Sequence, residues 1–265
     1  MERSDYLQIA IKAAKEAGEF IVERYNSLDE IGFTRKALFD YVTEIDAASE
    51  QLIIKTLRNT FPSHRILSEE TLKESSSEDE YLWIIDPLDG TTNFIHKYPV
   101  FAISIALQYK DEIITGVVYD PLRDELFTAE KGRGAFLNDQ RIFVSKRNSI
   151  EDAIITTGFP FRAKDRIDDY LEVFKSLFLR CSDLRRAGSA ALDLAYTASG
   201  RCEGFFELGL SAWDVAAGSL LVKEAGGIVS DFKGGSEYLS TGNIVASTPA
   251  IHGIIVDEVQ RVFNG

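Results

Sequence analysis

The sequence predicts a mixed fold of α-helices and β-strands arranged in two halves. Apolar residues recur every third or fourth position near the N-terminus, as in amphipathic helices, and alternating runs between residues 101 and 129 indicate an antiparallel meander. From about residue 146, strand-like and helix-like segments alternate, which is typical of an α/β unit. We therefore expect an α+β half over residues 1–145 and an α/β half over residues 146–265, which together bury a substantial core.

The elements of the N-terminal half follow from these patterns. Pro87 is expected to end the strand that precedes it. The expected elements are a helix over residues 7–25 with Ser4 as its N-cap, a polar loop that contains Lys36, a helix from Asp46 to just before Pro62, a solvated connection over residues 73–80, and strands over residues 66–70, 81–85, 101–108, 113–119 and 125–129.

The C-terminal half is expected to alternate strands and helices. The strands are predicted over residues 154–157, 183–185, 204–207, 228–230 and 244–246, and the helices over residues 168–178, 189–199, 214–225 and 249–263. Ligands favour the carboxyl edges of such sheets. Glu207 and Asp214 fit this rule, because they lie on either side of one connection.

Two segments place carboxylates where an apolar run turns into a helix, a position in which carboxylates commonly hold metal. Residues 81–85 form a buried strand, so Asp86 lies at its end and Asp89 follows three residues later. Carboxylates this close repel each other unless a cation lies between them, and Mg²⁺ prefers carboxylate and phosphate oxygens. The Leu88 carbonyl can join the shell. Asp214 is the carboxylate of the second segment.

The residues after Asp89 suit a phosphate group. Gly90 gives the backbone freedom, and the N–H groups of Gly90, Thr91 and Thr92 open a helical turn without intrahelical partners. We therefore expect phosphate and metal together. An aspartyl-phosphate enzyme is disfavoured, because its nucleophile and acid stand two residues apart, whereas Asp86 and Asp89 stand three apart.

Each candidate also has a purely structural interpretation. One alternative is that the aspartates, including Asp46, act as helix caps and have no other role, since Asp is common at helix starts. Glu69 stands beside a second glutamate and Lys36 beside an arginine, so the sequence leaves both open to a surface role. The histidines show no ligand spacing, and we expect all three to be structural: His64, His96 and His252.

With these residues in view, the chain resembles the inositol monophosphatase family from near its N-terminus to Gly265. The resemblance is carried by Asp-Pro-Leu-Asp-Gly-Thr-Thr-Asn-Phe over residues 86–94 and by Trp-Asp-Val-Ala-Ala-Gly over residues 213–218. Residues 158–161 and 204–210 are similar to the bacterial branch. The resemblance implies a layered αβαβα sandwich of the sugar phosphatase type.

The resemblance also implies a role for each matching residue. Two or three Mg²⁺ ions would be bound by Glu69, Asp86, the Leu88 carbonyl, Asp89 and Asp214. Asp46 and Thr91 would support the attacking water, and Glu69 would take its proton. Substrate contacts would come from Gly90, Thr91, Thr92, Lys36, Arg185, Gly188, Ser189, Ala190, Glu207 and Ser211. Ser211 departs from the family pattern, because animal members carry His and several bacterial members carry Arg at that place.

The activity implied by the resemblance is a Mg²⁺-dependent phosphomonoesterase that hydrolyses inositol monophosphates by in-line attack of a metal-activated water. Fructose 1,6-bisphosphate and other sugar or nucleotide phosphates remain open as substrates. Some bacterial members join the transcription machinery and affect ribosomal RNA synthesis, which makes protein binding a second class of function. The family further implies a homodimer and inhibition by lithium.

Composition restricts partners and compartment. The formal charge of −13, from 29 basic and 42 acidic residues, disfavours direct binding to nucleic acid. Cys181 and Cys202 form no Cys-x-x-Cys pair, no secretory leader precedes them, and the most apolar stretch, residues 100–107, is too short to cross a membrane. We expect a cytoplasmic protein whose two cysteines are buried thiols.

Overall fold

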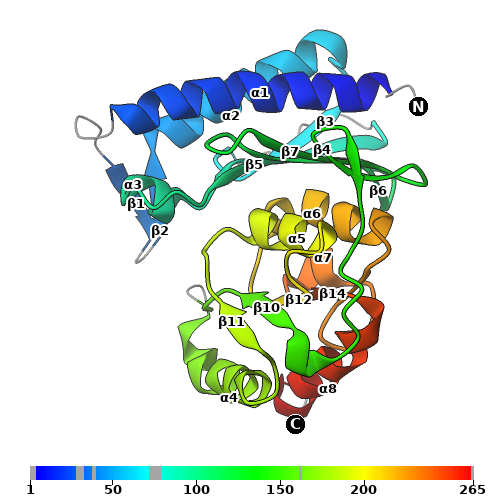
Figure 1. Cartoon of the computed structure of the whole chain (residues 1–265). Helices are drawn as coiled ribbons and strands as arrows, with labels where there is room; N and C mark the ends of the chain where they lie inside the picture. The colour runs from blue at the N-terminus through cyan, green and yellow to red at the C-terminus, as the bar shows by residue number, and fades with distance from the viewer. Residues whose placement is uncertain (1–3, 28–32, 38–39, 72–78, 161–162, 264–265) are drawn as a thin grey trace.

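A computed structural model of the chain describes residues 4–27, 33–37, 40–71, 79–160 and 163–263, and only the backbone of residues 33–37 and 40–43. These residues form five layers in the order helix, sheet, helix, sheet, helix (Figure 1). The layered αβαβα sandwich is thereby confirmed. Most of the connection expected over residues 73–80 lies outside the described residues.

The first layer consists of α1 (Asp5–Asn26) and α2 (Glu44–Thr60), which cover one face of the larger sheet (Figure 1). The predicted cap is confirmed, since the Ser4 hydroxyl accepts a hydrogen bond from the Leu7 N–H at 3.2 Å. Ile21 and Ile53 of these helices share a buried core with Trp83 of the sheet, and all three side chains are fully buried.

The larger sheet has seven strands within the described residues, in the order β3-β4-β5-β6-β7-β8-β9. Only the pair β3–β4 is parallel. The bounds are β3 (Arg65–Ser68), β4 (Tyr81–Asp89), β5 (Ala102–Tyr109), β6 (Glu112–Asp120), β7 (Glu125–Glu130), β8 (Gly134–Leu137) and β9 (Gln140–Ile142). The meander was predicted, whereas β8 and β9, short strands after a glycine turn, were not.

A short hairpin of β1 (Phe33–Ala37) and β2 (Asp40–Thr43) lies where the sequence predicted a polar loop. It lies beside α3 (Thr91–Ile95) at one edge of the larger sheet (Figure 1). The prediction of a loop was wrong because the two strands are short and pair only with each other within the described residues.

The middle layer is formed by α5 (Ala190–Ala198) and α6 (Ala212–Glu224), which pack between the two sheets (Figure 1). A methyl group on Gly116 of β6 would lie 2.9 Å from the Ala217 carbonyl oxygen, so the sheet and α6 touch backbone to backbone. Because α6 is enclosed on both sides, its apolar residues surround the helix rather than forming a stripe.

The smaller sheet has five strands in the described residues, in the order β11-β10-β12-β14-β13. β10 is parallel to β11 and β12, and β14 is antiparallel to both of its neighbours. The strands are β10 (Ile154–Thr157), β11 (Asp183–Arg185), β12 (Gly204–Glu207), β13 (Ile228–Ser230) and β14 (Ile244–Ser247). The remaining helices are α4 (Ile167–Phe178), α7 (Tyr238–Thr241), α8 (Pro249–Phe263) and single 3₁₀ turns at Ile150–Asp152 and Lys164–Arg166.

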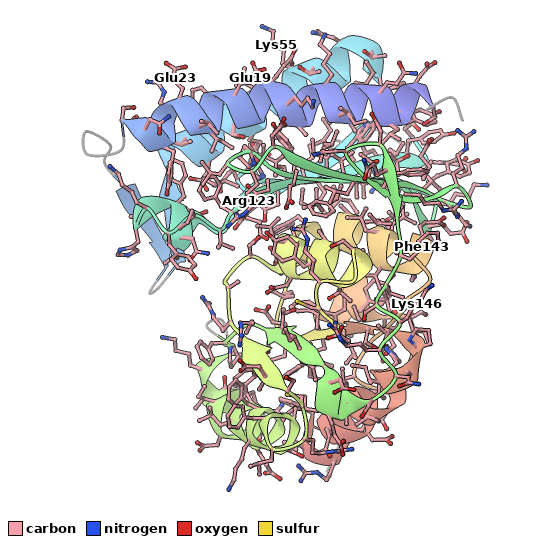
Figure 2. All side chains as sticks on the ribbon, viewed as in Figure 1. Glu19, Glu23, Lys55, Arg123, Phe143 and Lys146 are labelled. Carbon is pink, nitrogen blue, oxygen red and sulfur yellow. The ribbon has the colours of Figure 1, made fainter. Side chains whose placement is uncertain are left out.

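An extended segment connects the two sheets along the side of the molecule, where Figure 2 labels Phe143 and Lys146. It is held by a hydrogen bond from the Val144 N–H to the Ala225 carbonyl and by the Arg147 guanidinium, which donates to the buried Glu203 carboxylate at 2.7 Å. Cys181 and Cys202 are free thiols, and the expectation that both are buried was wrong for Cys181, which is only partly buried. Among the described helices, none has the length and apolar character needed to span a bilayer.

Candidate active site

A cavity of about 340 Å³ lies where the end of β4 meets the N-terminal ends of α5 and α6. Its lining combines acidic side chains, a glycine- and threonine-rich turn and a few apolar groups. The lining residues are Glu69, Asp86, Leu88, Asp89, Gly90, Thr91, Thr92, Asn93, His96, Gly158, Arg186, Gly188, Ser189, Ala190, Glu207, Leu210 and Asp214.

A β-bulge places Asp86 and Asp89 on the same face of the sheet. In a regular strand, residues three apart point to opposite faces. Here Asp86 pairs with Ser104 of β5 and Asp89 pairs with Ala102, so three steps along β4 match two along β5. The prediction that Pro87 ends the strand was wrong, because the missing N–H of Pro87 falls inside the bulge, where the regular ladder is interrupted.

Asp214 reaches the same place from the first turn of α6. Its carboxylate accepts a hydrogen bond from the Ser211 N–H at 2.7 Å, which caps the helix. One oxygen each of Asp86, Asp89 and Asp214 lies within 4.8 Å of the others, and all three side chains are buried. Asp214 is therefore both a cap and a member of the acidic cluster.

Asp89 joins the cluster to the middle helix layer. One of its carboxylate oxygens accepts hydrogen bonds from the Ser189 hydroxyl at 2.6 Å and from the Ala191 N–H at 2.8 Å. These donors form the start of α5, whose unpaired N–H groups and dipole favour a negative charge. The contact fixes the orientation of Asp89 from a segment one hundred residues away in the sequence.

The electrostatics of the cluster call for a cation. Burial raises the pKa of Asp86 well above its usual range, and the charges of Glu69, Asp89 and Asp214 raise it further, whereas the Leu88 N–H donates to the carboxylate and lowers it. The cluster offers only carboxylate oxygens, without the nitrogen or sulfur ligands that zinc prefers. Oxygen ligands alone suit a hard ion such as Mg²⁺.

A hydrogen bond joins Thr91 to Asp46. The Thr91 hydroxyl donates to an Asp46 carboxylate oxygen at 2.7 Å. The Leu88 carbonyl oxygen lies 3.1 Å from the same hydroxyl. Asp46 is buried in the first turn of α2, and Thr91 begins α3. Gly90 precedes this helix with a φ of +98°, a left-handed conformation that favours glycine.

Glu207 and Arg186 lie at the part of the cavity formed by the C-terminal half. Burial raises the pKa of the Glu207 carboxyl well above its usual range, with further contributions from Asp193 and Asp214, and the Arg186 charge opposes this. The Arg186 guanidinium also lies over the ring of Phe159 at 5.4 Å. Arg186 lines the cavity, whereas the residue expected from the sequence was the neighbouring Arg185.

The structure places several other predicted residues outside the cavity lining. Arg185 is half exposed and forms an ion pair with Asp183, so its side chain is engaged away from the acidic cluster. Ser211 contributes its backbone N–H to Asp214 but is not a lining residue. Lys36 belongs to β1, and its side chain lies outside the described part of the structure.

The histidines divide into two groups. His64 accepts a hydrogen bond from the Trp83 indole at 3.1 Å, and His252 lies between the hydroxyls of Ser230 and Ser247. Both are buried, and the structural interpretation holds for them. His96 differs from both, because it is exposed at the end of α3 and lines the cavity, and its structural interpretation stays a prediction.

The five layers and the buried carboxylate cluster define the class of protein, which is the layered sugar phosphatase fold. A family model described as the inositol monophosphatase family matches residues 2–263. The chain belongs to the inositol monophosphatase family.

Relatives span nearly the whole chain. It is 51% identical over 258 residues to the Nus factor SuhB of Pseudomonas aeruginosa, a match that covers 96% of this chain and 95% of the relative. The crystal structure of the extragenic suppressor protein suhB from Bartonella henselae superposes with a TM-score of 0.94 at 41% identity and covers 97% of this chain and 99% of that one. A structure of SaIMPase-II with inositol monophosphate bound gives a TM-score of 0.81 at 28% identity, covering 96% and 94%.

Proposed function

We propose that this chain is a Mg²⁺-dependent phosphomonoesterase that hydrolyses inositol monophosphates. The observation that carries the proposal is the buried cluster of Asp86, Asp89 and Asp214 in a cavity that Glu69 and Thr91 also line. Glu69, the cluster and the Leu88 carbonyl would hold the Mg²⁺ ions. When bound, these ions supply positive charge for the phosphoryl oxygens and lower the pKa of a water molecule.

The residues around the cluster would prepare the attack on phosphorus. Because the Thr91 hydroxyl donates its hydrogen to Asp46, its oxygen lone pairs remain to accept a hydrogen bond from the attacking water. Glu69 would take the proton that this water loses. The N–H groups of residues 90–92, at the start of a helical turn, would hold phosphate oxygens.

The alcohol part of the substrate would bind at the other side of the cavity. Glu207 would serve there as an acceptor for hydroxyl groups, next to Gly158 and in the same cavity as the small residues Gly188 and Ala190. Hydroxyl-rich rings satisfy such a site, and a ligand that lacks the hydroxyls leaves the buried carboxylate unpaired. The inositol monophosphate in the SaIMPase-II structure supports this choice of substrate.

The test is a panel of phosphate monoesters assayed with and without Mg²⁺ and compared by kcat/KM. We expect hydrolysis only with Mg²⁺, with the largest kcat/KM for myo-inositol 1-phosphate over fructose 1,6-bisphosphate and nucleotide phosphates. Added lithium should lower the rate by competing for a Mg²⁺ position. A preference for another ester would replace the proposed substrate, and equal rates without a divalent cation would contradict the metal-dependent reaction.

A variant pair links the activity to the cluster. Asp89→Asn removes one ligand charge and should lower kcat/KM by about 10²-fold or more. Asp111→Asn, the same change in an exposed turn between β5 and β6, should leave it unchanged. Equal activity of the two variants would contradict the assigned role of Asp89.

A second function in transcription is supported by relatives named Nus factor SuhB. The net charge of −13 suits a basic protein surface, so this role would use the outside of the molecule rather than the cavity. Asp89→Asn should then abolish hydrolysis and keep binding to RNA polymerase complexes, as measured by co-elution. The expected homodimer is tested by light scattering of the same samples.

A further inference from the structure

One polar face of α2 reaches three separate segments of the proposed active site. Ser49 and Glu50 follow Asp46 by three and four residues, so both lie on its side of the helix, and all three are almost completely buried. Asp46 holds Thr91, as described above. The Ser49 hydroxyl donates to the Pro87 carbonyl oxygen at 3.0 Å, inside the bulge between Asp86 and Asp89.

Glu50 holds the third segment, which carries Glu69. One oxygen of the Glu50 carboxylate accepts three hydrogen bonds: from the Ser68 hydroxyl at 2.5 Å, from the Glu70 N–H at 3.0 Å and from the Thr71 N–H at 3.3 Å. These donors stand on both sides of Glu69 in the sequence. The backbone of Glu69 itself donates to the Ile85 carbonyl of β4 at 3.2 Å.

The hydrogen bonds from Ser68, Glu70 and Thr71 to Glu50 restrict the direction of the Glu69 side chain. The residue directly follows the last position of β3, and its N–H hydrogen bond to Ile85 of β4 is the last one that the sheet supplies before the turn. Hydrogen bonds to a carboxylate are stronger than those between neutral groups, and here they fix the residues before and after Glu69. Glu69 and Asp86 line the same cavity, so a shift of this turn would move a carboxylate that faces the acidic cluster.

A buried carboxylate at this position is weak evidence for a role in stability. Taking a carboxylate out of water is costly, and buried charged groups can often be replaced by apolar residues without loss of stability. A charge buried between α2 and the sheet is better explained by the orientation that it imposes on the turn.

We propose that Glu50 is a positioning residue of the phosphatase site, which orients Glu69 toward the metal ions through the turn over residues 68–71. This inference rests on the proposed function. Together with Asp46 and Ser49, Glu50 makes the first turns of α2 a common support for the water-orienting pair, the bulge and the Glu69 turn.

The test uses substitutions of Glu50 in the full chain. Glu50→Ala removes the acceptor, Glu50→Asp keeps the charge but withdraws it by one methylene group, and Glu50→Gln keeps an oxygen for the same donors. Glu44→Gln, an exposed glutamate in the first turn of the same helix, is the control. The measurements are Mn²⁺ binding by the protein without substrate, kcat and KM at saturating Mg²⁺, and the melting temperature.

We expect Glu50→Ala and Glu50→Asp to weaken Mn²⁺ binding and to lower kcat by about 10- to 100-fold, as for other groups that orient metal ligands. KM should stay constant, and Glu50→Gln should recover most of both losses. If Glu50→Ala does not fold, Glu50→Asp and Glu50→Gln carry the comparison. A lower melting temperature with unchanged Mn²⁺ binding and kcat would overturn the proposal.

The Mn²⁺ titration separates this proposal from the proposed function. If the unaltered chain hydrolyses no phosphate ester, the proposed function fails, whereas the titration still shows whether Glu50 controls a metal site. If the unaltered chain is active and Glu50→Asp binds Mn²⁺ and turns over normally, only the role of Glu50 fails.

Discussion

Gly158→Ala should disturb substrate recognition without touching the acidic cluster. Gly158 follows β10 and lies directly against the carboxylate of Glu207. A methyl group at this position would be 2.0 Å from Glu207 Oε1 and 2.1 Å from its Cδ. The backbone of Gly158 is not in the left-handed region, so the effect comes from the contact and not from strain at the new alanine.

The size of the effect follows from the distance. Ordinary carbon contacts begin at 3.4 Å, so the Glu207 carboxylate must move by about 3.4 − 2.0 = 1.4 Å. A misplacement of about 1 Å can cost about 10²-fold in rate. We therefore expect kcat/KM for inositol monophosphate to fall about 10²-fold. A small ester without hydroxyl groups, p-nitrophenyl phosphate, should lose much less, because it does not use Glu207.

The assay is steady-state hydrolysis of both esters at saturating Mg²⁺, with Mn²⁺ binding as a check on the cluster. Gly253→Ala in α8 is the matched control, because a methyl group there meets nothing within 4 Å, and the change should stabilise the helix by about 0.5–1 kcal/mol. Equal losses for both esters, or no loss for either, would refute the assignment of Glu207 to the alcohol part of the substrate.

Three further predictions follow from the site. Thr91→Val removes the hydroxyl that donates to Asp46 and should lower kcat about 10²-fold at constant KM, whereas Thr91→Ser should remain active; a changed KM alone would contradict this. Mg²⁺ at 100 times its Kd should raise the free energy of unfolding by about 2.7 kcal/mol in thermal melts, and a melting temperature independent of Mg²⁺ would argue against a metal site. Burial and the Asp89 charge raise the pKa of Asp193 well above its usual range. Above about pH 4 the unfolded chain therefore releases a proton that the folded chain still holds, so the free energy of unfolding falls as the pH rises. Asp193→Asn removes this loss, so in EDTA its melting temperature should rise relative to that of the native chain as the pH increases above about 4; a constant difference would contradict it.

The local parts of the fold and site were predictable because short-range rules determine them. The helix that Ser4 caps shows its apolar stripe in the sequence. Asp86, Asp89 and Thr91 stand in one motif at the end of one strand, so their proximity needed no knowledge of the tertiary structure. The bulge that turns both carboxylates to one face was not predictable, because it depends on the pairing of β4 with β5.

The parts that sequence patterns missed depend on contacts between distant segments. Arg185 and Arg186 are adjacent at the end of a short strand, and adjacent residues of a strand point to opposite sides, so choosing between them requires the packing of β11. Glu50 carries no motif of its own, since its partners, the Ser68 hydroxyl and two backbone N–H groups, lie 18 to 21 residues away in the sequence. His96 lines the cavity only because α3 ends there.

The most direct test of the account is anomalous diffraction from crystals soaked in Mn²⁺ and inorganic phosphate. The account predicts anomalous peaks between the carboxylates of Asp86, Asp89 and Asp214, with a phosphate oxygen in the same coordination shell. Mn²⁺ bound elsewhere, with no peak at these three residues while phosphate occupies the cavity, would contradict it.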